Sequence, residues 1–461
     1  MRFRPKKIKN IWLLLSAAVV VLVLTVPCFA LLARDNAPHK ALEPFLTHRA
    51  EVTVCEPLDS ADGEILRYEI TQPRGHAKAW VFPDGSLFWC EESTDAFTLR
   101  LYGFSSEQAR HLDASKASSP FLAESDGRTV LIQPPLAREA GDLDGTNYIA
   151  VPAENGAVTC RLGTVKVRFQ GEQADWWAYV TPGNLADGCE DGLEWLTRCT
   201  MQKFGDANRM TLDGYYYQTP SDYIPTGTNY FYRLPAAYIP VKLARYGNSH
   251  HGRQIGAAML DIQTEHYCED GYIPTLPASG WLKTDYAIGA GFYDTRFNTD
   301  VAHALLTLGR TLGIDKFTNC ALDYAAFLTK HAEEHSFSTE NGILVHDYCH
   351  KDGNLPTLTS LNHQLAEILF LYETEDAACV ETAEKMLHGI EDLQEDWVRD
   401  DGDLHYAHLP DGTFGRNDYP YLTYNDLLAL DRYLGGNEAL QYLMEVKMAW
   451  MTANGVTEYN K

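Results

Sequence analysis

The sequence predicts a multidomain α+β protein with an N-terminal transmembrane segment, an antiparallel β-sandwich or barrel-like domain and a C-terminal α/α toroid. A long apolar run follows a basic start, short alternating segments with frequent turn residues come next, and helical hydrophobic periodicity fills the second half. We expect a cytoplasmic basic tail (1–10), a transmembrane signal anchor (11–33), a stem (34–50), a β-rich accessory domain (51–185) and an α/α-toroid domain (186–461).

The N-terminal segment has the composition of a membrane anchor. Five arginines and lysines precede the apolar run 11–33, which one serine, one threonine and one proline interrupt. A membrane-spanning helix needs about 20 apolar residues, and the upstream positive charges keep the N-terminus cytoplasmic. The alternative is a cleaved signal peptide, with residues 28–30 as the cleavage site. Both interpretations place the rest of the chain outside the cytoplasm, at the cell surface or in a secretory lumen.

The overall charge excludes some classes of partner. The formal net charge is -25, whereas binding to nucleic-acid phosphates needs clustered Lys and Arg, so we expect no nucleic-acid partner. The ten cysteines form no Cys-x-x-Cys pair, the histidines show no metal-ligand spacing and no glycine-rich phosphate loop is present, so we expect neither a metal nor a cofactor. The oligomeric state stays open, with a homodimer as one option.

The part from residue 51 to residue 185 has the pattern of short antiparallel strands. Gly, Pro, Asp and Asn separate the apolar runs at short intervals, which is typical of a sandwich or barrel. We expect strands over 51–55, 64–71, 78–82, 86–90, 96–102, 129–133, 147–151, 158–169 and 176–180. No catalytic group of residues is evident here, so a structural or substrate-presenting role is expected.

The rest of the chain has helical periodicity. A short helix should contain Pro240 in its first turn and end at Gly247. We expect further helices over 192–203, 254–267, 298–312, 316–333, 357–372, 376–393, 423–434 and 438–452. Long loops (269–296, 336–356 and 395–420) alternate with short ones. Helical hairpins with their long loops collected at one end are typical of an α/α toroid, and these loops would converge on a cleft.

The most distinctive stretch, 405–421, lies directly before the helix 423–434. It combines tyrosines, histidines and one arginine with the turn Pro410-Asp411-Gly412. Phenol, imidazole and guanidinium groups on a loop held by a helix suit a site for a polar substrate. A well-packed turn with exposed tyrosines is the alternative at this stage.

Several segments, taken in order, resemble one family, the D-glucuronyl C5-epimerases of heparan-type polysaccharides. The first is Tyr-Ile-Pro-Val-Lys-Leu-Ala-Arg-Tyr-Gly-Asn-Ser-His at 238–250, which is similar to a conserved segment of that family. The others lie at 269–274, 291–293, 356–372 and 418–427. The resemblance implies an enzyme that removes the C5 proton of a uronic acid in a polymer and returns a proton to the opposite face, without a redox cofactor.

The resemblance also implies roles for individual residues. Tyr419 falls on the family's catalytic tyrosine, whereas the family's Glu-Tyr pair has no counterpart, so we expect His350 or Asp352 to supply the second proton carrier. The expected substrate-binding residues are Tyr238, Arg245, His250, His346, Asn362, Tyr406, His408 and Arg416.

We therefore expect a membrane-anchored enzyme acting on a uronic-acid-containing polysaccharide. A polysaccharide lyase would share the first step, proton abstraction at C5, and a glycosidase would need two opposed carboxylates. A non-catalytic glycan-binding protein is the third interpretation, because the Glu-Tyr pair of the family is missing.

Overall fold

The computed structural model describes residues 40–95, 97–100, 109–112, 119–125, 128–138, 157–161, 164–169, 173–185, 210–216, 223–224, 233–246, 249–267 and 271–459. The chain divides into two compact units, Met1–Glu43 and Pro44–Lys461. The expected basic tail and transmembrane segment lie outside the described residues and stay predictions. Within the described part, we find no helix that is long and apolar enough to cross a bilayer.

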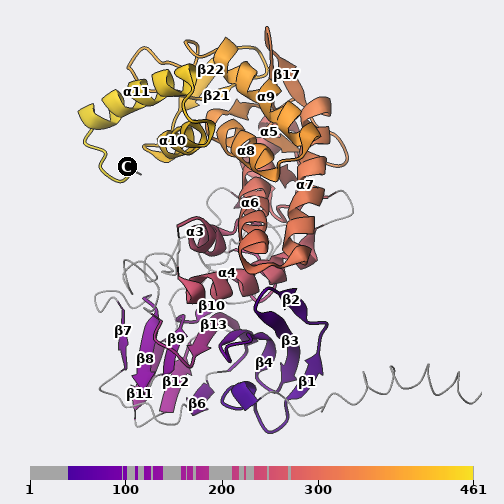
Figure 1. Cartoon of the computed structure of the whole chain (residues 1–461), viewed down its shortest axis with the longest axis vertical. Helices are drawn as coiled ribbons and strands as arrows, with labels where there is room; N and C mark the ends of the chain where they lie inside the picture. Colours follow the sequence, from indigo (N-terminus) through magenta and orange to yellow (C-terminus); the bar gives the residue numbers. More distant parts are fainter. Residues whose placement is uncertain are drawn as a thin grey trace, which may run out of the picture. The chain divides into compact units, whose positions relative to one another are not determined.

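The first part of the second unit is dominated by antiparallel β-structure (Figure 1). The strands are β1 (Glu51–Val54), β2 (Leu58–Ser60), β3 (Gly63–Gln72), β4 (Gly75–Val81), β5 (Leu87–Ser93), β6 (Phe97–Arg100), β7 (Ala109–His111), β8 (Phe121–Ser125), β9 (Arg128–Ile132), β10 (Leu136–Arg138), β11 (Ala157–Arg161), β12 (Thr164–Arg168) and β13 (Gln173–Thr181). Among the described residues, a ten-stranded sheet has the order β1-β3-β4-β5-β13-β9-β8-β7, with β2 beside β3 and β10 beside β13. A three-stranded sheet has the order β11-β12-β6.

The burial of the strands explains their sequence patterns. β13 pairs with β5 on one side and β9 on the other, and residues 174–179 are all buried. A strand covered on both faces has a mostly apolar sequence, and here the buried run includes Trp176 and Trp177 and one polar residue, Asp175, which accepts a hydrogen bond from the Leu212 backbone N–H. β12 is covered on one face, so buried Val165 and Val167 alternate with exposed residues.

The expected antiparallel β-structure is confirmed. Each expected strand within the described residues coincides with observed strands, while 147–151 lies outside them. The run 158–169 is a hairpin rather than one strand, because Arg161 of β11 pairs with Thr164 of β12. The strands β2, β7, β8 and β10 were missed, because three to five residues are too short to show a clear period.

Helices form most of the rest of the described chain. They are α3 (Tyr238–Tyr246), α4 (His250–Gln263), α5 (Gly280–Tyr286), α6 (Thr295–Leu312), α7 (Asp315–Glu334), α8 (Leu361–Thr374), α9 (Ala377–Asp392), α10 (Leu422–Leu434) and α11 (Glu438–Ala453), with 3-10 turns η1 (Lys40–Leu42) and η4 (Thr264–His266). Consecutive long helices pack in pairs: α3 with α4, α6 with α7, α8 with α9 and α10 with α11. One row runs α3, α6, α8, α10, and α7 contacts α9, which contacts α11. The fold is therefore mixed α+β, and the closed ring of a toroid stays a prediction.

The expected helices between residues 298 and 452 are confirmed to within a few residues at their ends. α6 begins earlier than expected because the Asp294 side chain accepts a hydrogen bond from the Phe297 backbone N–H, which makes Asp294 the N-cap. It ends at Gly313, whose φ of 65° suits glycine. α5 was not expected.

Short strands join the three long loops to one another. They are β14 (Tyr223–Ile224), β15 (Ala278–Ser279), β16 (Tyr293–Asp294), β17 (Ser336–Ser338), β18 (Ile343–Val345), β19 (Tyr348–Cys349), β20 (Thr359–Ser360), β21 (His405–His408) and β22 (Phe414–Asn417). β16 pairs with β19, β20 pairs with β21, and β21 pairs with β22. The loops that precede α6, α8 and α10 therefore meet.

The sheet and the helices share one hydrophobic core. The core contains Trp80 and Trp177 from the sheet, Leu260 from α4, Leu305 from α6 and Leu427 from α10. Burial of this apolar surface is the main stabilising contribution.

A buried lysine fixes the last long loop. The Lys447 ammonium of α11 is fully buried and lies 2.6 Å from Asp403 Oδ1 and 2.8 Å from Asp418 Oδ2. Asp418 directly precedes Tyr419, so this contact also holds the backbone beside that tyrosine.

We expect Lys447→Met to lower the free energy of unfolding by about 3–5 kcal/mol, because it leaves two buried carboxylates without a countercharge. Urea unfolding measures this change. Lys385→Met is the matched control, because Lys385 forms an exposed ion pair with Glu381 and such pairs contribute little. Equal effects of the two substitutions would contradict the prediction.

Candidate functional site

A cavity of about 750 Å³ lies where the row of helices α3, α6, α8 and α10 begins. Tyr238 is the first residue of α3, Arg296 the second of α6, Asn362 the second of α8 and Leu422 the first of α10. The cavity is lined by Tyr223, Ala236, Ala237, Tyr238, Val241, Lys242, Ser279, Trp281, Asp294, Arg296, Phe297, Asp300, Tyr348, Asn362, His363, Tyr406, Arg416, Asn417, Tyr419 and Leu422. The structure thus places four helix N-termini at one cavity.

The walls of the cavity favour an anionic ligand. Helix N-termini carry a partial positive charge and attract anions. Lys242 and Arg416 add two cationic side chains. The Arg416 guanidinium lies 4.7 Å from the centre of the Trp281 ring and 3.7 Å from Asp285 Oδ2. The guanidinium lies over the face of the ring, and its nearest carboxylate lies beyond hydrogen-bond distance, so its N–H groups can donate to a ligand carboxylate.

Arg296 has a structural role at the same place. Its Nη1 donates to the Asn362 carbonyl oxygen at 2.9 Å and to Asp426 Oδ2 at 2.6 Å, and its Nε donates to Asp300 at 3.0 Å. Burial alone would lower the pKa of Arg296, but Asp300 and Asp426 raise it, so the guanidinium stays charged. These bonds join the N-terminal ends of α6, α8 and α10.

Five tyrosines line the cavity, and three of them, Tyr348, Tyr406 and Tyr419, belong to the long loops before α8 and α10. The rings of Tyr406 and Tyr419 meet edge to face, with 5.7 Å between their centres. Tyr419 is 47% exposed, whereas Tyr348 is buried. Burial raises the pKa of all three phenols, and the nearby Arg296 opposes this rise at Tyr419. The phenols are therefore neutral at pH 7 and can donate protons.

Asp294 is the cavity residue with the pKa closest to neutral. Burial raises the pKa of its carboxyl to about 7, although the backbone N–H groups of Phe297 and Arg296 oppose the rise. A carboxyl with such a pKa can take up and release a proton at neutral pH. Asp294 and Tyr419 thus place a potential base and a potential acid in one cavity.

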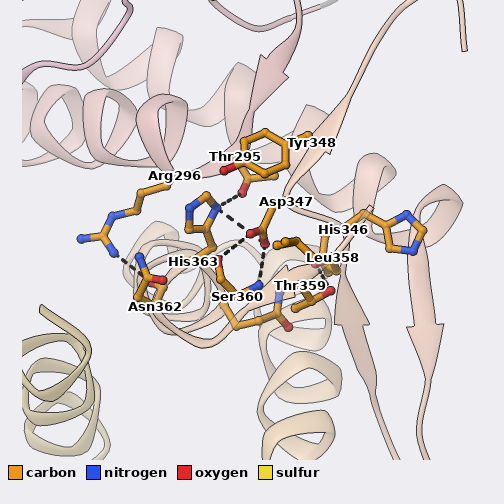
Figure 2. Close-up of polar contacts among 12 residues, drawn as sticks. Thr295, Arg296, His346, Asp347, Tyr348, Leu358, Thr359, Ser360, Asn362 and His363 are labelled. Atoms are coloured by element: carbon orange, nitrogen blue, oxygen red, sulfur yellow. Dashed lines mark hydrogen bonds and ion pairs between the residues drawn. The ribbon is translucent and has the colours of Figure 1, made fainter. Parts of the chain in front are cut away.

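A buried network behind the cavity wall holds Tyr348 in place (Figure 2). Asp347 accepts hydrogen bonds from the backbone N–H and the hydroxyl of Ser360. His363 Nδ1 lies 2.8 Å from the Thr295 hydroxyl and 3.6 Å from Asp347 Oδ1. Burial raises the pKa of Asp347, which the hydrogen bonds from Ser360 oppose, and burial lowers the pKa of His363. The network connects the start of α6, the start of α8 and the strand β19.

Five predicted site residues line the cavity: Tyr238, Asn362, Tyr406, Arg416 and Tyr419. The structure therefore brings together residues that are up to 181 positions apart in the chain. The family resemblance gave only the order of their segments along the sequence.

His350 and Asp352 are not among the residues that line the cavity. The His350 ring has partners at both nitrogens, because Nδ1 accepts from the Asp352 backbone N–H at 3.2 Å and Nε2 lies 3.1 Å from the Ala290 carbonyl oxygen. The Asp352 side chain is 78% exposed. These contacts stabilise a turn, and the same loop instead presents Tyr348 to the cavity.

Three further predicted binding residues, His250, His346 and His408, also do not line the cavity. His346 and His408 pack against Phe337, with ring centres 4.4 Å and 4.9 Å from it. His346 and Asp347 are neighbours in an extended segment, so their side chains point to opposite sides, and Figure 2 shows the His346 ring directed away from His363. His250 contacts Asp84 of the β-region, and the Arg245 side chain lies outside the described residues.

Sequence reasoning missed Asp294, Arg296, Tyr348 and His363 as site residues. One signal was present for Asp294, since a polar residue directly before an apolar helical pattern is typical of an N-cap. Tyr348 and His363 looked like ordinary residues of a loop and a helix, and only the tertiary contacts place them at the cavity.

No protein-family model matches the chain, and none of the curated proteins matches it. Similar solved structures include a D-mannose isomerase (14% identity, 47% of this chain and 59% of that chain, TM-score 0.35) and the cellobiose 2-epimerase from Bacillus thermoamylovorans B4167 (10% identity, 47% and 58%, TM-score 0.36). Another is the unsaturated glucuronyl hydrolase from Bacillus sp. GL1 (14% identity, 47% and 59%, TM-score 0.33). The chain spans less than two thirds of each of these proteins. Likeness at this level carries no argument about fold or function.

A further buried carboxyl, Glu367 of α8, makes stability depend on pH. Burial raises its pKa to about 8, and its Oε2 accepts a hydrogen bond from Gln364. The folded pKa exceeds the unfolded value of about 4.3, so the folded state holds a proton that the unfolded state releases. The stabilisation is complete below pH 4 and is lost as the pH rises through about 8.

We expect the free energy of unfolding of Glu367→Gln to fall less steeply with pH than that of the wild type, by about 1.4 kcal/mol per pH unit over this interval. Urea unfolding at several pH values measures the slope. Glu381→Gln, at an exposed position of α9, should leave the wild-type slope unchanged. Parallel profiles for Glu367→Gln and the wild type would show that Glu367 is ionised in the folded protein.

Proposed function

We propose that the cavity inverts C5 of a uronic acid residue within a polysaccharide. The observation that carries this proposal is the presence of Asp294, with a pKa of about 7, and neutral Tyr419 in one cavity with the cationic groups Lys242 and Arg416. The chemistry requires a base, an acid and a site for a carboxylate, and these residues supply all three.

The inversion consists of two proton transfers, one on each face of the sugar ring. Asp294 takes the C5 proton, and the electron pair of the C–H bond moves into the uronate carboxyl group to give an enolate-like species. The Tyr419 hydroxyl then donates its proton to C5 from the opposite face. Exchange with solvent reprotonates Tyr419, which is half exposed, and deprotonates Asp294. No electrons enter or leave, so the reaction needs no redox partner.

The cationic groups act on the charge that develops in this reaction. As the proton leaves C5, negative charge grows on the carboxyl oxygens, and preorganised donors stabilise a transition state most where charge develops. Lys242, Arg416 and the N-termini of α6 and α8 are the candidates for this role. Arg296 holds these N-termini in place through its bonds to Asn362 and Asp426.

Two features of the sequence support the proposed polymer and location. The resemblance of five ordered segments to glucuronyl C5-epimerases favours a glucuronate-containing polymer as substrate. The apolar run 11–33 favours a membrane anchor with the site outside the cytoplasm. A lyase would use the same first step and then break the bond at C4, so product analysis distinguishes the two activities.

We expect Tyr419→Phe to reduce formation of the C5-inverted residue by about 10²–10⁴-fold, because it removes the group that donates a proton from the opposite face. The measurement is NMR of a polymer of glucuronate and N-acetylglucosamine after incubation with the enzyme. Tyr442→Phe, at an exposed position of α11, should form the inverted residue at the wild-type rate. Inversion at the wild-type rate by Tyr419→Phe would remove Tyr419 from the mechanism, and an absorbing unsaturated product from the wild type would identify a lyase.

We also expect kcat/KM to rise with pH through about 7, because Asp294 must be ionised to accept the proton. Asp294→Asn should lose exchange yet keep α6 intact, since asparagine also caps helices. Circular dichroism checks the helix content, and exchange assays over a pH series give the profile. A profile without an inflection near pH 7 would exclude Asp294 as the base.

A further inference from the structure

A second polar cluster lies at the contact between the large sheet and α4, apart from the residues that line the proposed active site. Asp84 lies between β4 and β5, and His250 and His251 form the first turn of α4. The potential ligand atoms of these three residues all lie within 4.8 Å of one another. We propose that this cluster binds a divalent transition-metal ion and that zinc fits it.

The cluster brings its potential ligand atoms close together. His250 Nε2 lies 3.1 Å from Asp84 Oδ2, and Gln254 Nε2 donates to Asp84 Oδ2 at 3.1 Å and lies 3.0 Å from His250 Nε2. A neutral histidine with its proton on Nδ1 has a lone pair on Nε2, and this tautomer can bind a metal ion through Nε2. Two imidazoles and one carboxylate whose ligand atoms lie within 4.8 Å of one another can therefore share one cation.

Neighbouring groups orient the ligands. Asp84 Oδ1 accepts from the Ser86 backbone N–H at 2.9 Å, which directs Oδ2 toward His250. The Tyr179 hydroxyl of β13 lies 2.9 Å from His251 Nδ1 and also bonds to the side chain of Gln254. Hydrogen bonds of this kind hold the first ligands of metal sites in place.

The ligand types select the metal. Two imidazole nitrogens and one carboxylate oxygen suit zinc, with bonds of about 2.0–2.2 Å. The separation of 3.1 Å between Asp84 Oδ2 and His250 Nε2 is near the roughly 3.3 Å that such bonds give in a tetrahedron. A cavity of about 390 Å³, lined in part by Asp84, His250 and Gln254, adjoins the cluster and leaves room for water as a fourth ligand.

The site is accessible and links two parts of the fold. The side chains of His250 and Asp84 are 43% and 34% exposed, so an ion reaches them from solvent. Asp84 belongs to the β-region and the histidines to α4, and the unfolded chain does not hold these groups together. Bound zinc therefore stabilises the folded state. This inference is independent of the proposed epimerase activity.

The test uses the full chain, stripped of metal with a chelator and titrated with Zn²⁺ by calorimetry. We expect one Zn²⁺ per chain and a rise of Tm on zinc addition. Co²⁺ in place of zinc should give the visible absorption of a site with nitrogen and oxygen ligands. His250→Gln and Asp84→Asn should bind zinc at least tenfold more weakly and lose the Tm shift.

His388→Ala is the matched control, because His388 of α9 is a half-exposed histidine 4.0 Å from a carboxylate, that of Glu391. It should bind zinc like the wild type. The Tm of each variant without metal shows that it is folded, and circular dichroism gives the same check. Absence of zinc binding to the wild type, or wild-type binding by His250→Gln, would overturn the proposal and leave only the contact between His250 and Asp84.

Discussion

The candidate active site depends on the hydrogen bonds that the buried Arg296 guanidinium makes with two neighbouring helices. The guanidinium bonds to the Asn362 carbonyl oxygen at the start of α8 and to the Asp426 carboxylate in α10. The cost of burying the charge is offset by these bonds and by Asp300, because a buried ion is tolerated only when it is paired and hydrogen-bonded. A small displacement of any of the three helices would break this arrangement, so their N-terminal ends keep a fixed geometry around the cavity.

This geometry determines the protonation states of the neighbouring groups. Burial in the same region raises the pKa of Asp294 to about 7 and that of Glu367 to about 8, even though Arg296 opposes both shifts. Near neutral pH the carboxyl groups of Asp294 and Glu367 can therefore gain or lose a proton, whereas the neighbouring tyrosine phenols stay protonated. The chain as a whole is strongly acidic, with a net charge of -25, yet Lys242 and Arg416 give the cavity wall cationic groups. An acidic protein can therefore place cationic groups together at one cavity.

The last helix, α11, and the large sheet both support the candidate site, through different contacts. Lys447 of α11 pairs with Asp418 beside Tyr419, so the last helix holds the loop that carries the proposed acid. The large sheet acts through α4, which shares its hydrophobic core and meets it again at Asp84 and His250. The β-region thus supports the helices that form the cavity and, with bound zinc, would hold α4 more firmly.

The sequence by itself determined the antiparallel strands, the long helices and the importance of the stretch around Tyr419, because these depend on local periodicity, turn residues and a short motif. It also pointed to Tyr238, Asn362, Tyr406 and Arg416, which line the cavity. Only the tertiary structure decided that the loop before α8 presents Tyr348 rather than His350 to the cavity. β19 ends at Cys349, and the His350 ring instead contacts the Ala290 carbonyl oxygen and the Asp352 backbone N–H. The near-neutral pKa of Asp294 likewise arises from burial among segments distant in the chain, and Asp84 meets His250 across 166 positions. Acidity and ligand geometry depend on such long-range neighbours, which no spacing in the sequence encodes.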